Sequence, residues 1–256
     1  MMAQHFQLDD SMQIVDLKGG QFFPYYNLKC ISVLGEGHDG TVVLASSTGG
    51  LVAVKTFQRS QSSPGRTRRF LAEVNAMRSL SHPNLVQCYQ AAMCDDYFAF
   101  SMPYYPGGDL TTVLSGHHQM DTATILRRMI EVSFAVEYLH ERCFAHLDIK
   151  LENVFLDGAG HAHLGDLGLL KHVTTESRTL LARDLGVRCL RARRDVLAVG
   201  VQSKTGVNVD YKARMRAATG LRMSLRSALD QMLEPDPAQR PTASKVLELF
   251  FMASVV

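Results

Sequence analysis

The chain changes character at residues 103–110, PYYPGGDL, where two prolines and two glycines interrupt any regular helix or strand. Before this break, short β-branched and apolar runs such as CISVL, TVVLAS and LVAVKTF alternate with glycine-containing turns, which is typical of strands. After it, apolar residues recur at helical spacing, namely Ile125, Met129, Val132, Val136 and Leu139. We therefore expect an α+β fold with two lobes of unequal size.

The first lobe is expected to span residues 25–103 as a small antiparallel sheet with one main helix. The strand-like runs from Tyr25 to Lys55 predict a meander, and strands return at LVQCYQAAM and YFAFSM. The spacing predicts a helix over residues 67–80, with one face formed by Phe70, Val74 and Met77. Residues 1–24 are weakly patterned and predict an extension packed on this lobe, whereas residues 104–256 predict a mostly helical second lobe.

Composition narrows the classes of function. No apolar run among the 256 residues approaches the roughly 20 that a membrane span requires, and the start MMAQHFQLDDSM lacks a secretory signal. The five cysteines have no C-x-x-C spacing, which favours reduced thiols in the cytoplasm or nucleus. A net charge of +2 gives no indication of a nucleic-acid partner. We expect an intracellular protein that is not secreted, with no membrane or nucleic acid as partner.

A glycine-rich segment, LGEGHDGTVVLA, carries Gly35, Gly37 and Gly40 between two predicted strands. Glycines let the backbone approach a ligand closely, so that its amide N–H groups face phosphate oxygens. A simple hairpin turn explains the glycines equally well. A dinucleotide-binding fold would continue with a helix, whereas a strand follows here, which favours a flap over a mononucleotide.

Lys55 ends the strand-like run LVAVK, whose apolar neighbours would bury the stem of the side chain. A buried ammonium without an anionic partner is costly, and Glu73 on the next predicted helix is the nearest suitable carboxylate. Taken singly, an exposed lysine and a solvated glutamate remain the simpler interpretation of each residue.

The polar stretch HLDIKLEN, residues 146–153, and the later HLGDLGLL supply three hard oxygen donors, Asp148, Asn153 and Asp166. Such donors suit Mg²⁺, which takes few protein ligands and retains water and phosphate. Lys150 adds a cation for a transferred phosphate. With the glycine flap and the paired lysine, these are the working parts of phosphoryl transfer.

In this order the motifs resemble those of the eukaryotic-type protein kinase family, over roughly Tyr25 to Phe250. HPN at residues 82–84, DVLAVGV at residues 195–201 and EPDPAQRPTASKVL with Arg240 extend the resemblance. The resemblance implies a bilobal kinase fold, ATP and Mg²⁺ as cofactors, and protein substrates with serine or threonine acceptors. Lys150, two residues after the base position, is similar to the serine/threonine branch.

The resemblance also implies a role for individual residues. Asp148 falls on the catalytic base, Lys150 on the catalytic-loop lysine, and Asn153 and Asp166 on the magnesium ligands. A stack of core side chains is implied at Met77, Cys88, His146 and Leu167. The implied ATP-binding residues are Leu34, Gly35, Glu36, Gly37, His38, Asp39, Gly40, Thr41, Val42, Ala53, Lys55, Glu73, Met102, Tyr104 and Phe155.

The chain departs from the family pattern at Leu147, which replaces an arginine that in the family receives a phosphate on the activation loop. We therefore expect activity that does not depend on such phosphorylation. No Ala-Pro-Glu follows Asp166; the nearest match ends in Asp184, which would pair with Arg240, and Ser177 would supply a hydroxyl near the base. The abbreviated outline is similar to kinases of large DNA viruses, including herpesviruses.

A basic cluster falls within this divergent region, at Arg188, Arg191, Arg193 and Arg194. A solvated basic face, docking of an acidic substrate and a nuclear-import patch are all compatible with it.

The leading interpretation is a serine/threonine protein kinase. A pseudokinase that serves as a nucleotide-binding or protein-binding scaffold is the main alternative, because the segment after Asp166 is degraded. A small-molecule kinase of related fold is a third interpretation, which the segment around Arg240 disfavours.

Overall fold

The computed structural model describes residues 14–37, 40–59, 64–115, 120–173 and 241–255, together with residues 227, 231 and 239. The chain divides into two compact units. Unit 1 comprises Met1–Ser81 and Val86–Tyr105, and unit 2 comprises His82–Leu85 and Pro106–Val256. The last junction along the chain, between Tyr105 and Pro106, falls inside the PYYPGGDL break.

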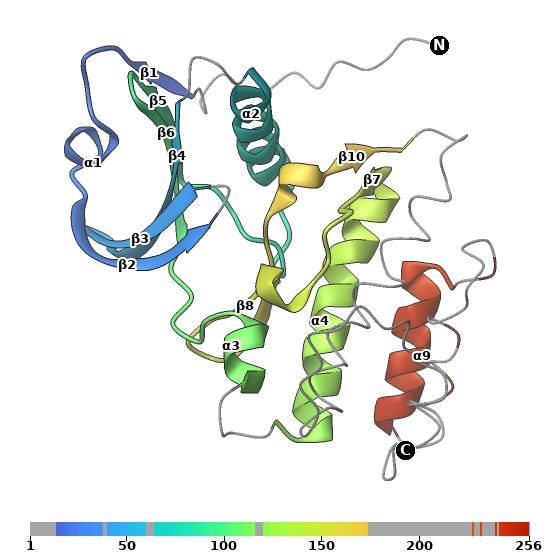
Figure 1. Ribbon diagram of the computed structural model, residues 1–256. Coiled ribbons are helices and arrows are strands. Elements are labelled where there is room, and N and C mark those ends of the chain that lie inside the picture. The colour runs from blue at the N-terminus through green and yellow to red at the C-terminus, as the bar shows by residue number, and fades with distance from the viewer. Residues whose placement is uncertain are drawn as a thin grey trace, which may run out of the picture. The chain divides into compact units, whose positions relative to one another are not determined.

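Unit 1 is built on one six-stranded sheet in the order β1-β5-β6-β4-β3-β2 (Figure 1). Neighbouring strands pair antiparallel, as the sequence predicts for the meander, but β1 pairs parallel with β5, so the sheet is mixed. The predicted strand LVQCYQAAM is wrong over its first half, because β5 begins only at Gln90. Leu85, the first residue of that run, belongs to unit 2, where it forms an isolated bridge with Leu164. The strands are β1 (Val15–Leu17), β2 (Lys29–Gly37), β3 (Gly40–Ser47), β4 (Gly50–Gln58), β5 (Gln90–Cys94) and β6 (Tyr97–Pro103).

One face of this sheet packs against α2 (Pro64–Ser79). The predicted helix is confirmed, and it starts slightly earlier, at a proline, which is well suited to the first turn of a helix because it needs no N–H partner there. The predicted apolar face is also confirmed, since Phe70, Val74 and Met77 are all buried. The Phe70 ring stacks on Phe98 with centroids 5.0 Å apart and meets Phe57 edge-on at 5.9 Å.

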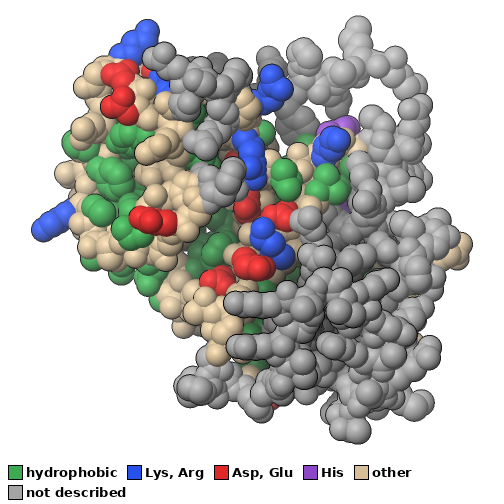
Figure 2. Space-filling model, in the orientation of Figure 1, with side chains coloured by type: hydrophobic (Ala, Val, Ile, Leu, Met, Phe, Trp, Pro, Cys, Tyr) green, Lys and Arg blue, Asp and Glu red, His purple; other side chains and the backbone are tan. Residues whose placement is uncertain are grey.

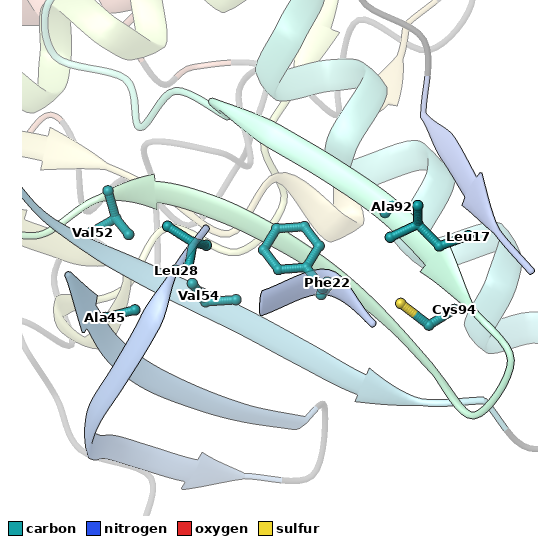
Figure 3. Packing of buried hydrophobic residues seen from close by; sticks show 9 residues of the cluster. Leu17, Phe22, Leu28, Ala45, Val52, Val54, Ala92 and Cys94 are labelled. Atoms are coloured by element: carbon teal, nitrogen blue, oxygen red, sulfur yellow. The ribbon is translucent and has the colours of Figure 1, made fainter. Parts of the chain in front are cut away.

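The opposite face of the sheet is covered by part of residues 15–28, which we call the N-terminal strap and whose first residues form the edge strand β1. The sequence predicts only a weakly patterned extension before residue 25, but the strap contains β1 and α1 (Phe22–Tyr25). Both elements are too short to show a period, and Pro24 lies within α1. Leu17, Phe22 and Leu28 of the strap are buried against the sheet (Figure 3).

Unit 2 contains three described helices, α3 (Leu110–Ser115), α4 (Thr122–Glu141) and α9 (Ala243–Val255). Asp121 caps α4 by accepting a hydrogen bond from the Thr124 backbone N–H at 2.7 Å. The predicted apolar stripe is confirmed at Val132, Val136 and Leu139, which are buried. α9 lies beside α4 (Figure 1), where Phe251 meets Phe134 at 5.9 Å between ring centroids.

Two small two-stranded sheets complete the described part of unit 2. β7 (Phe144–Ala145) pairs with β10 (Lys171–His172), and β8 (Val154–Leu156) pairs with β9 (Ala162–Leu164), in both cases antiparallel. Two 3-10 turns flank the β8–β9 hairpin, η2 (Leu151–Asn153) before it and η3 (Leu167–Leu169) after it. Within the described ranges, no helix is long and apolar enough to cross a membrane.

Glu131 of α4 fastens this helix to the β8–β9 hairpin. Its carboxylate accepts hydrogen bonds from Arg128 Nη1 at 2.7 and 2.8 Å, from His161 Nδ1 at 2.8 Å and from the Ala162 backbone N–H at 2.8 Å. Burial raises the pKa of Glu131, but the hydrogen bonds from His161, Arg128 and Ala162 outweigh it, so that the pKa lies below its ordinary value of 4.5. The ionised carboxylate therefore stabilises the folded state.

Glu131→Gln is expected to lower the free energy of unfolding by about 2 kcal/mol at neutral pH, because charge-assisted hydrogen bonds are lost. Since folding lowers this pKa, the stabilisation is present above the ordinary value of 4.5 and is lost as the pH falls through the folded-state pKa. Urea unfolding followed by circular dichroism at stepped pH should show the difference between wild type and variant shrinking below that value. A difference that stays constant with pH would contradict this account.

A matched control is Glu248→Gln, which removes a carboxylate from an exposed ion pair with Lys245 in α9. It is expected to change the free energy of unfolding by less than about 0.5 kcal/mol.

Candidate active site

Lys55 and Glu73 form a partly buried ion pair in unit 1. Lys55 Nζ lies 2.8 Å from Glu73 Oε1, with 14% and 5% of the two side chains exposed. The ammonium also lies 5.0 Å from the ring centroid of Phe57 and 5.8 Å from that of Phe100. The ion pair expected from the sequence is therefore present, and it links β4, which carries Lys55, to α2, which carries Glu73.

The glycine-rich segment forms a hairpin in which β2 and β3 pair as far as Gly37 and Gly40. Gly40 has φ +138° and a Cβ there would overlap the carbonyl oxygen of Thr56, so only glycine is compatible with this backbone. A Cβ built at Gly35 or Gly37 meets no atom within 4 Å. The backbone at these two glycines is thus open to a ligand, as a phosphate-binding flap requires. His38 and Asp39 lie outside the described residues.

The remaining ATP-binding predictions in unit 1 fall on neighbouring strands. Thr41 and Val42 lie on β3, with Val42 paired with Lys55, and Ala53 on β4 is paired with Met102 on β6. Leu34 and Glu36 are exposed on β2, and Tyr104 follows β6 directly. Figure 2 shows hydrophobic side chains gathered over the part of unit 1 that carries α1, β2 and β3, where the exposed apolar residues include Ile31, Val33 and Leu34.

His146 braces the candidate catalytic turn in unit 2. Its ring is fully buried, and its Nδ1 lies 3.2 Å from the backbone N–H of Asp148, while its Nε2 lies 3.0 Å from the carbonyl oxygen of Gly165. A neutral ring protonated on Nε2 satisfies both contacts, accepting from Asp148 and donating to Gly165. One side chain thereby ties Asp148 to the residue that precedes Asp166.

Lys150 and Asn153 both donate hydrogen bonds to the Asp148 carboxylate. Lys150 Nζ donates to Asp148 Oδ2 at 2.8 Å, and Asn153 Nδ2 donates to the same oxygen at 3.1 Å and to the Asp148 backbone carbonyl at 2.8 Å. Asp148 and Asn153 are buried, whereas 38% of the Lys150 side chain is exposed. The predicted base, lysine and amide are therefore brought together in one hydrogen-bonded cluster.

Asp166 is linked to this cluster through the backbone of the preceding residue, Gly165. The Gly165 N–H donates to the carbonyl oxygen of Asn153 at 2.8 Å, which fixes the residue before Asp166. Asp166 adopts a left-handed conformation with φ +57° and accepts from the Gly168 N–H at 3.4 Å, and the neighbouring Leu167 is buried. Aspartate tolerates this conformation better than most residues.

The oxygen donors at Asn153 and Asp166 match the preference of Mg²⁺. Both side-chain hydrogen bonds of Asn153 use Nδ2, which leaves its amide oxygen available to a cation. Amide and carboxylate oxygens are the ligands that Mg²⁺ takes, with water and phosphate completing its shell. Within the described residues no group of three or more His, Cys, Asp or Glu is arranged to hold a metal ion.

Leu147 also has a left-handed backbone, with φ +65°, and is half-buried between His146 and Asp148. This conformation is strained for a leucine, and such strain is retained where the surrounding structure dictates it. Nothing in the sequence pattern indicates it, because neither glycine nor asparagine marks the position.

Sequence reasoning assigned no bracing role to His146, Asn84 or Glu131. Asn84 Nδ2 donates to the Ala162 carbonyl at 2.8 Å, and the Asn84 carbonyl accepts from the Leu164 N–H at 2.8 Å. Asn84 thus binds both ends of β9, the strand that ends two residues before Asp166. The HPN motif was the available signal for Asn84.

Of the other predicted residues, some are described and lie apart from this cluster in the sequence, and some lie outside the described residues. Phe155 lies half-buried on β8, with an isolated bridge to Asp109. Met77, Cys88 and Leu167 are buried in their own units, and burial raises the pKa of the Cys88 thiol to about 11, which makes it an inert core residue. Outside the described residues lie Ser177, Asp184, the segment 195–201, Arg240 and the basic cluster at Arg188, Arg191, Arg193 and Arg194.

Among the proteins that this chain resembles are three serine/threonine-protein kinases. It is 29% identical over 273 aligned residues to PAK mbt from Drosophila melanogaster, which covers 95% of this chain and 42% of the relative. It is 35% identical over 153 residues to ppk16 from Schizosaccharomyces pombe, covering 59% and 22%, and 34% identical over 158 residues to UCNL from Arabidopsis thaliana, covering 56% and 38%. The chain therefore spans less than half the length of each of these relatives.

The family model for the protein kinase domain matches residues 28–192, which is more than half of the chain. This match includes both the Lys55–Glu73 pair and the cluster around Asp148. The chain belongs to the protein kinase domain family.

Proposed function

We propose that this protein is a serine/threonine protein kinase that transfers the γ-phosphate of ATP to hydroxyl groups of protein substrates. The observation that carries the proposal is the cluster in which Lys150 and Asn153 hold the Asp148 carboxylate, and His146 links its backbone to the residue before Asp166. A scaffold without turnover has no need to preserve this arrangement of a base, a cation and two oxygen donors.

Each group has a definable task. Asp148 orients the acceptor hydroxyl and takes its proton, and Lys150, which already contacts Asp148 Oδ2 at 2.8 Å, steadies the phosphoryl group as it moves. Lys55, held by Glu73, grips the α- and β-phosphates. Asn153 and Asp166 would hold Mg²⁺, which neutralises charge on the transferred phosphate when it is bound.

Serine and threonine are the proposed acceptors for two reasons. Lys150 stands two residues after the base, as in the serine/threonine branch, and the similar proteins from fly, fission yeast and Arabidopsis are all named serine/threonine-protein kinases. Tyrosine is not expected as an acceptor.

The proposal is tested by incubating purified protein with labelled ATP, Mg²⁺ and a generic basic protein substrate. Asp148→Asn removes the base and Lys55→Met removes the phosphate grip, so each should reduce label transfer by about 10²-fold or more. Equal label transfer by wild type and both variants would contradict the enzyme assignment. If wild type transfers no label but is stabilised against melting by ATP and Mg²⁺, the pseudokinase scaffold is the better interpretation.

We also propose that activity does not require phosphorylation of the activation loop. Leu147 occupies the position at which the family's arginine would receive that phosphate, and an apolar side chain has no charge with which to bind it. The half-buried Leu147 instead packs as part of the turn.

Complete dephosphorylation by a phosphatase, verified by mass spectrometry, is therefore expected to leave initial rates of label transfer within roughly twofold of the untreated protein. A matched mock treatment controls for handling losses. Loss of activity on dephosphorylation, followed by recovery during preincubation with ATP, would show that a phosphate-dependent switch persists without the arginine.

A further inference from the structure

The N-terminal strap is tied to the sheet of unit 1 by three hydrogen bonds besides the pairing of β1 with β5. The Gly19 N–H donates to Asp95 Oδ2 at 2.8 Å, the Phe22 N–H donates to the Tyr97 hydroxyl at 2.9 Å, and the Tyr26 hydroxyl donates to the Ala91 carbonyl at 3.3 Å. All three partners belong to β5, β6 or the turn between them. The strap is thus anchored along its length to one hairpin.

The strap and the sheet have complementary side-chain sizes. On the sheet, the buried residues of this cluster are small or β-branched: Ala45, Val52, Val54, Ala92, Cys94 and Ala99. The three larger buried side chains, Leu17, Phe22 and Leu28, all come from the strap, and Figure 3 shows the Phe22 ring lying over β6, the strand that pairs with β4. Close packing of an interior requires the bulk that the strap supplies, so the strap is an integral layer of unit 1.

The strap and β4, the strand that carries Lys55, contribute side chains to the same buried cluster. Side chains alternate along β4, so Val52 and Val54 point to the strap while Ala53 and Lys55 point to the opposite face, where Lys55 meets Glu73. Val54 is fully buried and directly precedes Lys55. Because packed interiors transmit displacement, a cavity on the strap side would let β4 shift and change the reach of Lys55.

We infer that the strap, through Phe22, positions β4 for binding ATP. Phe22 is proposed as a positioning residue, since it shares a buried cluster with Val52 and Val54 of β4 and would act on Lys55 through that strand. The inference rests on the proposed function, because it assigns the strap a part in the grip that Lys55 has on the phosphates.

Steady-state kinetics of Phe22→Ala tests this inference, with label transfer measured while ATP and the protein substrate are varied separately. Displacement of β4 should raise KM for ATP by roughly tenfold while KM for the protein substrate stays within about twofold. The hydroxyl that accepts from the Phe22 N–H is removed in Tyr97→Phe, which should give a smaller rise in KM for ATP. Phe22→Leu should recover most of the wild-type value because it refills the cavity in part.

Phe250→Ala is the matched control, since Phe250 is equally buried but lies on α9 of unit 2. A purely structural loss lowers the fraction of folded protein and therefore the apparent kcat, but leaves KM for ATP unchanged. If Phe22→Ala does not fold, KM for ATP is compared between Phe22→Leu, Tyr97→Phe and the control. An unchanged KM for ATP in the folded strap variants, or an equal rise in Phe250→Ala, would overturn the inference.

The same variants separate this inference from the proposed function. If wild type transfers no label, its affinity for ATP, measured from nucleotide-dependent melting, replaces KM. A wild-type protein that binds no ATP overturns both proposals. A wild-type protein that binds ATP, with strap variants that bind it equally tightly, overturns the inference alone.

Discussion

The buried imidazole of His146 is the contact on which the candidate active site depends. It joins the backbone of Asp148 to the carbonyl of Gly165, and so holds two segments that are separate in sequence at a fixed spacing. Asn153 adds a second link, because its side chain binds Asp148 and its carbonyl accepts from the Gly165 N–H. A catalytic group must be held within a fraction of an ångström, and buried hydrogen bonds of this kind supply that precision.

The β8–β9 hairpin is secured from outside by α4 and by Asn84. Glu131 binds the N–H of Ala162, the first residue of β9, and Asn84 binds the carbonyl of the same residue. Asn153 directly precedes this hairpin and Asp166 follows it, so the two proposed magnesium ligands depend on supports that never touch the metal. In unit 1, the strap and α2 support β4 from opposite faces in a comparable way.

Local patterns in the sequence predicted most of this fold and site. The glycine hairpin, the helix around Phe70 and the stripe of α4 each have a clear period or turn signal, and the Lys55–Glu73 pair follows from the cost of an unpaired buried charge. The strap escaped prediction because β1 and α1 are too short for periodicity, and its parallel pairing with β5 joins residues 77 positions apart. The left-handed conformation of Leu147 also escaped, since it is imposed by the surrounding contacts and not by the residue type.

The most direct test of the account is the dependence of ATP affinity on Mg²⁺ concentration, compared between Asp166→Ala and Asp148→Asn. Asp166 is proposed to hold the metal and Asp148 to take the acceptor proton, so Asp166→Ala should lose the Mg²⁺-dependent gain in affinity. Asp148→Asn should keep that gain while phosphate transfer falls by about 10²-fold or more. An Asp166→Ala variant with wild-type dependence on Mg²⁺ would contradict the proposed division of tasks.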